Sequence, residues 1–330
     1  MDLTRREFLK FTLAAGVAAK LAGCITGETE PAHNPEIGGL PRRILGRTEQ
    51  PVTILGLGCG YVGAKGIDEA QTRATIEAAL AGGVRYFDTC PDYVRSEERL
   101  GPILAPVRDE IFLVTKVNYP DAKGAEKDFI QSLKLLKTDH VDLLLQHCVG
   151  VANRSDTATM LAKGGSLEFM RKAKAMGLTR FLGMSIHHPH AAALTLLDAA
   201  DDYDVVMPFV NYVSRAEFNA EGKVVERARR DGLGVVAMKV LGGDGQLADD
   251  YNRTFRYTLS VPGVSCALVG VRSADEVRRA VRAAKEFRPL TAAEMAETIR
   301  LGEQMFRSKS PKAALLERHL ERDLAGAWYA

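Results

Sequence analysis

Four residues that could together move a proton lie where three successive apolar runs end. Asp88 and Tyr93 close the first of these runs, Lys116 closes the second and His147 the third. A phenol is a poor acid near neutrality, with an unperturbed pKa of about 10, but a neighbouring ammonium stabilises the phenolate and lowers that pKa. The carboxylate would hold the ammonium in place. The tyrosine could then protonate a carbonyl oxygen as hydride arrives at carbon, while the imidazole orients the same oxygen.

Each of the four has an ordinary structural explanation when it is taken alone. An aspartate at a strand end is commonly a helix cap, a tyrosine a rim aromatic and a histidine a hydrogen-bonded core residue. Together, an acid, a phenol, an ammonium and an imidazole serve no packing purpose and would be costly to bury without partners. We therefore interpret the set as catalytic.

Short apolar runs alternate with amphipathic segments from residue 42 to about 285, and this alternation must position the four residues. Several runs are apolar throughout, as expected for strands buried on both faces of a parallel sheet. Eight strand–helix units predict an α/β protein with a (β/α)8 TIM barrel, whose chemistry lies at the C-terminal strand ends. The predicted strands are 55–58, 84–88, 111–116, 141–147, 181–185, 205–211, 235–241 and 266–270.

Further elements are expected at both ends of the barrel. A β-hairpin is predicted between 43–45 and 52–55, and extra C-terminal helices from about 291 to 307 and from 312 to 324. Three capping-box patterns mark helix starts, pairing Asp68 with Gln71, Ser273 with Glu276 and Thr291 with Glu294.

Composition narrows the function classes. The net charge of +2 over 330 residues gives no indication of a nucleic-acid partner. The five cysteines show no CxxC pair and no zinc-finger spacing, so we predict no metal site. An unrelated hydrolase on a barrel would need paired carboxylates or metal ligands at its strand ends, and the sequence shows neither.

Residues 1–23 have the order of a twin-arginine export signal. The pair Arg5-Arg6 precedes an apolar stretch, 11–21, which ends at a lipoprotein-like box before Cys24. We expect export by the twin-arginine route, lipidation of Cys24 and a periplasmic or lipid-anchored location, with membrane contact only through the signal or that anchor. The alternative is an amphipathic N-terminal helix with an incidental cysteine. Residues 24–41 are interpreted as a flexible tether, and 42–330 as one barrel domain.

The body of the chain resembles the aldo-keto reductase family from about residue 42 to 290. The matching stretches are Leu55-Gly56-Leu57-Gly58, the block from Asp88 through Tyr93 to Ser96-Glu97-Glu98-Arg99-Leu100-Gly101, Lys116, His147, Gly183-Met184-Ser185, Asn211 and Gly270-Val271-Arg272-Ser273. The resemblance implies that Tyr93 is the general acid, that Asp88 and Lys116 are its partners and that His147 is the orienting group. It also implies NADP(H), in preference to NAD(H), lying across the barrel mouth, and a small carbonyl or alcohol substrate.

The same resemblance assigns contacts to the cofactor, together with departures from the family pattern. Ser185 and Asn211 would face the nicotinamide carboxamide, although Ile186 and Met207 stand where the family often has amides. Leu241 belongs to a matching strand-end stretch, Leu241-Gly242-Gly243. Lys239 could meet the pyrophosphate or be an exposed rim lysine.

The last predicted strand-to-helix turn should bind phosphate, because a helix N-terminus favours anions. Arg272 and Ser273 are therefore predicted ligands of a 2′-phosphate. Glu276 is either a cofactor ligand or only the partner of Ser273 in a helix cap. Ala280 stands where the family often places an adenine-facing asparagine.

Other residues allow two interpretations. Cys59, Cys90 and Cys148 could serve redox or metal chemistry or simply fill the barrel mouth. His187, His188 and His190 could bind metal or substrate, or mark the start of a helix. At the level of the whole protein, an active carbonyl reductase competes with an exported nucleotide-binding or sensory module of the same fold.

Overall fold

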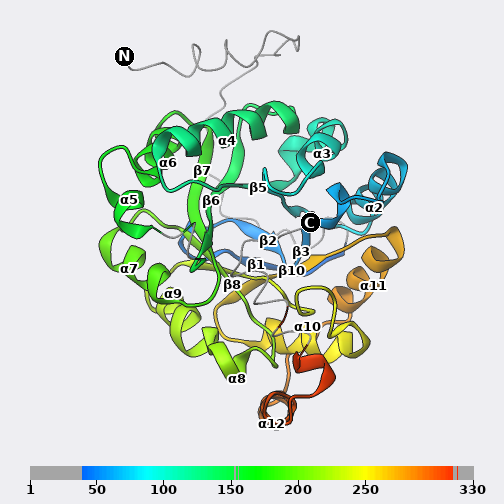
Figure 1. The fold of residues 1–330 in the computed structure, drawn as a ribbon. Coiled ribbons are helices and arrows are strands. Elements are labelled where there is room, and N and C mark those ends of the chain that lie inside the picture. The colour runs from blue at the N-terminus through cyan, green and yellow to red at the C-terminus, as the bar shows by residue number, and fades with distance from the viewer. Residues whose placement is uncertain (1–38, 152–153, 155, 315–317, 319–330) are drawn as a thin grey trace, which may run out of the picture.

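The computed structural model describes residues 39–151, 154, 156–314 and 318, and it confirms the predicted barrel (Figure 1). Eight parallel strands follow one another around the ring in chain order, and β10 closes it by pairing with β3. The strands are β3 (Leu55–Gly58), β4 (Tyr86–Asp88), β5 (Phe112–Val117), β6 (Val141–Val149), β7 (Thr179–Ile186), β8 (Val205–Pro208), β9 (Gly234–Ala237) and β10 (Val264–Gly270). The predicted signal peptide, Cys24 and most of the tether lie outside the described residues.

Helices surround the strands on the outside of the barrel, as Figure 1 shows. They are α2 (Glu69–Ala81), α3 (Ser96–Leu104), α4 (Ala122–Leu136), α5 (Thr157–Leu161), α6 (Ser166–Ala175), α7 (Ala191–Ala199), α8 (Arg215–Phe218), α9 (Glu226–Arg230), α10 (Tyr251–Ser260), α11 (Ala274–Lys285) and α12 (Ala292–Arg307). The predicted first C-terminal helix is confirmed as α12, which packs on α8 and α10. Most of the second predicted helix, 312–324, lies outside the described residues. None of the helices described is long and apolar enough to cross a membrane.

The predicted hairpin is present as β1 (Arg42–Ile44) and β2 (Pro51–Thr53), paired antiparallel. Arg43 donates from Nη1 to the carbonyl oxygens of Leu259 and Val264, 2.8 and 2.7 Å away. Ser265 donates to the carbonyl of Ile44. These bonds reach the beginning of β10, so the hairpin lies at the N-terminal end of the barrel and leaves the opposite end open for chemistry.

Two strands end earlier than predicted, which moves three predicted site residues into loops. Strand β8 ends at Pro208 because the chain turns at Asn211, whose Oδ1 accepts hydrogen bonds from the backbone N–H groups of Val213 and Ser214. Strand β9 ends at Ala237, and Lys239 adopts a left-handed conformation with φ of 55°. Leu241 therefore lies in the loop that follows β9.

The three predicted capping boxes differ in completeness. At Thr291 and Glu294 both reciprocal bonds form. Asp68 caps α2 through the backbone N–H of Gln71, but the side chain of Gln71 donates instead to the carbonyl of Arg272. Tertiary contact has therefore replaced the second bond of that box and ties α2 to the turn before α11.

Candidate active site

A buried ion pair lies at the C-terminal ends of β4 and β5. Lys116 Nζ is 2.6 Å from Asp88 Oδ1 and also donates to the carbonyl of Thr89 at 2.7 Å. Each charged side chain is only 1% exposed. Burial raises the pKa of Asp88, and the neighbouring ammonium opposes that shift. Such a pair contributes little net stability, but it fixes the position of the ammonium.

Tyr93 lies against this ammonium. Lys116 Nζ is 4.9 Å from the centroid of the tyrosine ring, within cation–π distance. The tyrosine follows a turn in which its own N–H donates to the carbonyl of Cys90 and its carbonyl accepts from the N–H of Ser96. The chain after β4 therefore brings the phenol back over the strand end.

His147, two residues before the end of β6, completes the group. Its ring lies edge-to-face with that of Tyr93, with 6.0 Å between centroids, and the side chain is buried. Burial lowers the pKa of His147 well below its usual value, and the positive charge of Lys116 lowers it further. The structure thus brings Asp88, Tyr93, Lys116 and this histidine together, with the imidazole neutral.

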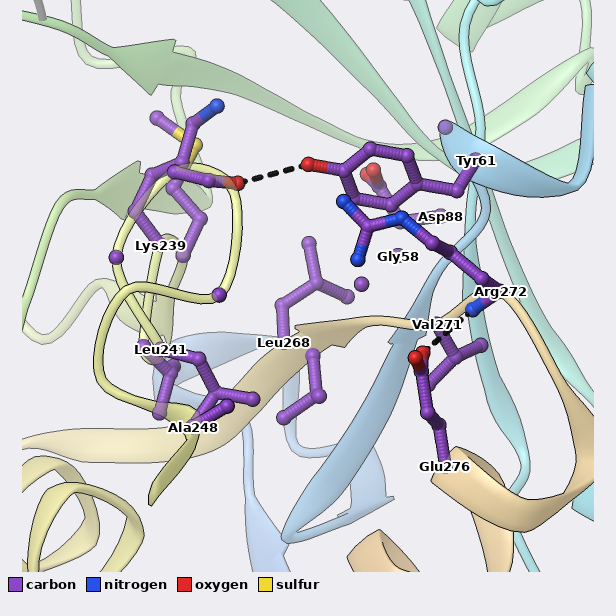
Figure 2. A pocket seen from close by; sticks show the side chains of 18 of the residues that line it. Gly58, Tyr61, Asp88, Lys239, Leu241, Ala248, Leu268, Val271, Arg272 and Glu276 are labelled. Atoms are coloured by element: carbon purple, nitrogen blue, oxygen red, sulfur yellow. Dashed lines mark hydrogen bonds between the residues drawn. The ribbon is translucent and has the colours of Figure 1, made fainter. Parts of the chain in front are cut away.

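Asp88 and Tyr93 form part of the wall of a pocket that extends across the ends of β3, β9 and β10 (Figure 2). The other lining residues are Gly58, Gly60, Tyr61, Met207, Met238, Lys239, Val240, Leu241, Gly242, Gly243, Gly245, Ala248, Tyr251, Leu268, Val269, Gly270, Val271, Arg272, Glu276 and Arg279. The pocket therefore runs from the proton-transfer group to the beginning of α11.

Four of the predicted cofactor residues lie on this wall: Lys239, Leu241, Arg272 and Glu276. The guanidinium of Arg272 lies 3.8 Å from the centroid of the Tyr61 ring, and both side chains project into the pocket in Figure 2. The carboxylate of Glu276 accepts from the backbone N–H of Arg272 at 2.7 Å. Glu276 therefore braces the turn on which this arginine is carried.

The other three predicted cofactor residues do not line the pocket. Ser185 accepts at Oγ from the N–H of Cys148. Ser273 caps α11 by accepting from the N–H of Glu276. Asn211 is fully buried and donates from Nδ2 to the carbonyl of Lys239 at 3.0 Å. In this arrangement the three hold the backbone around the pocket.

A loop at 239–250 passes over the pocket and is held from two sides. Tyr61, in the 3-10 turn Tyr61–Gly63, donates from its hydroxyl to the carbonyl of Gly243 at 2.9 Å, as Figure 2 shows. Arg279 donates to the carbonyl of Ala248 at 2.6 Å. The sequence interpretation missed both clamps. Arg279 could have been found, since it lies three residues after Glu276 on the same helix face.

The cysteines at the barrel mouth are buried. Burial raises the pKa of both Cys59 and Cys90, so both remain thiols. Among the residues that the structure describes, no three His, Cys, Asp or Glu side chains gather closely enough to hold a metal ion. The alternative interpretation of the three histidines, that they mark the start of a helix, is confirmed: His190 directly precedes α7.

The pocket suits an elongated, phosphate-bearing nucleotide. Its floor includes Gly58 and Gly270, which pair across β3 and β10 and offer only backbone there. A Cβ atom at Gly58 would lie 3.5 Å from the Cα of its partner. Cationic side chains lie on the walls at Lys239 and Arg272, and the 12-residue helix α11 begins beside them. Cations and a helix N-terminus are the groups that phosphates bind.

Comparison with known proteins gives a consistent result. The sequence model of the aldo/keto reductase family matches residues 54–257. Pyridoxal 4-dehydrogenase of Microbacterium luteolum is 23% identical over 73% of this chain and 92% of its own length. Aldo-keto reductase AKR2E4 of Bombyx mori is 27% identical, and the matched segment covers 58% of this chain and 63% of that relative.

Solved structures of similar proteins have the same fold. A putative aldo-keto reductase from Pseudomonas aeruginosa superposes with a TM-score of 0.63 at 28% identity, covering 74% of this chain and 95% of its own. An aldo/keto reductase from Klebsiella pneumoniae in complex with NADP and acetate has a TM-score of 0.66 at 24% identity, covering 79% and 95%.

Proposed function

Because the chain belongs to the aldo/keto reductase family, we propose that it is an NADP(H)-dependent oxidoreductase that interconverts small aldehydes or ketones with alcohols. The observation that carries this proposal is the buried Asp88–Lys116 pair beside the ring of Tyr93, with Asp88 and Tyr93 in the wall of the pocket. The family resemblance and the dehydrogenase and reductase names of several relatives support the same reaction class.

Tyr93 is the general acid in this proposal. An ammonium beside a phenol stabilises the phenolate, so the tyrosine can release a proton to a carbonyl oxygen and regain it in the reverse direction. Asp88 holds the ammonium of Lys116 at a fixed point, so the charge is already in place when the proton moves. Both charged side chains are only 1% exposed, so bulk water does not reach the ion pair.

Binding of the nucleotide falls to the opposite end of the pocket. Lys239 would meet the pyrophosphate, and Arg272, with the first turn of α11, a 2′-phosphate, which favours NADP(H) over NAD(H). When bound, the nicotinamide supplies or accepts the hydride. Tyr61 would keep the loop 239–250 closed over the nucleotide through its bond to Gly243.

The test is turnover by the purified full-length protein. We expect NADPH oxidation with some members of a panel of aldehydes, ketones and quinones, and loss of about 100- to 10,000-fold in kcat for Tyr93→Phe. Tyr119→Phe is the matched control, because Tyr119 is 49% exposed and outside the pocket wall. Activity that survives Tyr93→Phe would overturn the mechanism. Nucleotide binding without any turnover would favour the sensory-module alternative.

We also propose that the protein is exported and carries a lipid on Cys24. A twin-arginine route carries folded proteins, so a nucleotide acquired in the cytoplasm could travel with this one. Intact-mass measurement of the membrane fraction should show a mature chain that begins at residue 24 and carries lipid. Replacing Arg5 and Arg6 with lysines should keep the precursor uncleaved, and unchanged processing would contradict the assignment.

A further inference from the structure

Asn118, two residues beyond Lys116, makes a short hydrogen bond to the imidazole of His147. Its Oδ1 is 2.6 Å from Nδ1 of His147. The same oxygen accepts a hydrogen bond from Nη1 of Arg154 at 2.9 Å. The asparagine is 7% exposed, so these contacts form inside the protein.

The chemistry of its neighbours determines which end of the Asn118 amide faces His147. Its Nδ2 lies 3.2 Å from Oδ1 of Asp92 and 3.0 Å from Oδ2 of Asp128. Ionised carboxylates only accept hydrogen bonds, and a guanidinium only donates them. A flipped amide would face an NH₂ group toward Arg154 and an oxygen toward two carboxylates. The oxygen therefore faces the histidine.

This orientation determines the tautomer of His147. An amide oxygen at 2.6 Å from Nδ1 requires a proton on that nitrogen, because two acceptors would repel each other. Cys90 Sγ lies 3.1 Å from the same nitrogen, but burial keeps Cys90 as a thiol, which is a weak partner.

A neutral imidazole with its proton on Nδ1 carries a lone pair on Nε2. The neutral form is favoured by burial and by the positive charges of Lys116 on β5, Arg154 after β6 and Lys239 after β9, while His187 after β7 disfavours a second charged imidazole beside it. Tyr93 approaches from the segment after β4. Since Nδ1 is engaged with Asn118, a ligand oxygen that approaches His147 from the side of Tyr93 would meet Nε2, which accepts hydrogen bonds in this tautomer.

We propose that Asn118 is a positioning residue that makes His147 a hydrogen-bond acceptor, so that the resting site recognises the hydroxyl of an alcohol in preference to the oxygen of a carbonyl compound. The proposal rests on the reaction class proposed above and deepens it. An alcohol can donate to Nε2 and accept from the hydroxyl of Tyr93. A carbonyl oxygen can only accept, and it would face the Nε2 lone pair without a proton between them.

The tautomer can be measured without cofactor or turnover. In the full-length protein labelled with ¹⁵N-histidine, we expect one neutral imidazole with protonated Nδ1 and unprotonated Nε2 across pH 6 to 9. Its absence from His147→Gln assigns the signal. A proton on Nε2, or an imidazolium in this pH range, would overturn the proposal even if the enzyme is active. Absence of turnover with the expected tautomer would instead count against the proposed function.

The ligand preference is tested with dead-end pairs: benzyl alcohol with NADPH and benzaldehyde with NADP⁺. We expect roughly tenfold tighter alcohol binding from one additional hydrogen bond. The two pairs give a ratio of dissociation constants, that of benzaldehyde over that of benzyl alcohol. The two cofactors differ between the pairs, but they contribute equally in every variant, so comparing this ratio between variants removes their contribution. Because the equilibrium constant fixes the ratio of forward and reverse kcat/KM, binding is the informative readout.

Asn118→Asp should reverse the preference. A carboxylate against Nδ1 favours the imidazolium, which donates from Nε2, so benzaldehyde binding should gain relative to benzyl alcohol and become pH-dependent. Asn118→Ala, which removes the acceptor, should bring the ratio toward one. An unchanged ratio in folded variants would overturn the positioning role. If both variants fail to fold, the tautomer measurement on the unsubstituted protein still decides.

Discussion

Asp88 and Lys116 hold one side of the pocket through a buried ion pair on two strands, whereas Tyr61 and Arg272 form the other side from half-buried residues on loops. The geometry of the first side is set by the fold before any ligand arrives. The second side is built from backbone, glycines and cations, whose favourable contacts form mainly when a ligand binds. Substitutions on the strand side should therefore change stability and activity together, and those on the loop side should change affinity alone.

Lys116→Met should give the largest change. It leaves Asp88 buried without its partner, which costs about 3–5 kcal/mol of unfolding free energy and removes the charge beside Tyr93. Urea unfolding measures the loss. Lys174→Met is the control, since its bridge to Asp204 is at the surface and should be worth about 0–1 kcal/mol. Equal losses of unfolding free energy for the two substitutions would show that the buried ion pair does not make the strand side of the pocket more important for stability.

Glu97 should make the strand side pH-dependent. It is buried beneath this side, accepts from Thr115 at 2.6 Å, and burial raises its pKa to about 7. The raised pKa means that its contribution is fully present below the unfolded pKa of about 4.5 and is lost as pH rises through about 7. Glu97→Gln should therefore be more stable than the unsubstituted protein at pH 8, by at most roughly 3 kcal/mol.

Thermal unfolding of both proteins from pH 4 to 8 checks this. The difference between them should grow through pH 5 to 7 and remain constant above about pH 8. A difference that is the same at every pH would show that the carboxyl does not titrate in the folded protein.

Arg272→Leu should change affinity but not stability. Loss of a charge-assisted contact should weaken NADPH binding by roughly 10- to 100-fold and NADH binding much less, because only NADPH carries the 2′-phosphate. Fluorescence titration with each nucleotide measures this. Arg278→Leu is the control on the same helix, where the side chain is exposed and pairs with Asp275. Equal losses for the two nucleotides would assign Arg272 to support of Tyr61 instead.

Tyr61→Phe should give the smallest effect. It removes the bonds from the hydroxyl to Gly243 and Asp244, at a cost of about 1 kcal/mol, while the ring still covers Arg272. NADPH should dissociate several-fold faster in stopped-flow displacement, with little change in association. A slower association instead would mean that the tyrosine shapes the entrance of the pocket and does not retain the nucleotide.

The proton-transfer group could be predicted from sequence because each side chain lies at or just after the end of an apolar run. Parallel strands in a barrel bring their C-terminal ends together, so the order of the runs already implied proximity. The barrel and hairpin followed from the same alternation. Asn118 was missed because its role depends on Asp92, Asp128 and Arg154, which come from separate segments of the chain.

The binding side was harder to predict because its geometry depends on loops. Asn211 closes an apolar run and was expected to face the cofactor, but the chain turns there and uses its amide to hold backbone. Lys239 adopts a positive φ although it is not a glycine, so the residue type at this position did not predict a turn. The bond between Tyr61 and Gly243 joins positions 182 residues apart.

The pairing of Gly58 with Gly270 has a consequence for the order in which the molecule can assemble. The pocket floor joins the first strand of the barrel to the last, so it forms only when nearly the whole domain has been synthesised and closed. A ligand that binds there stabilises every element of the ring at once by mass action. Under the proposed twin-arginine export, nucleotide occupancy would therefore serve as a checkpoint for completed folding before the chain leaves the compartment in which it is synthesised.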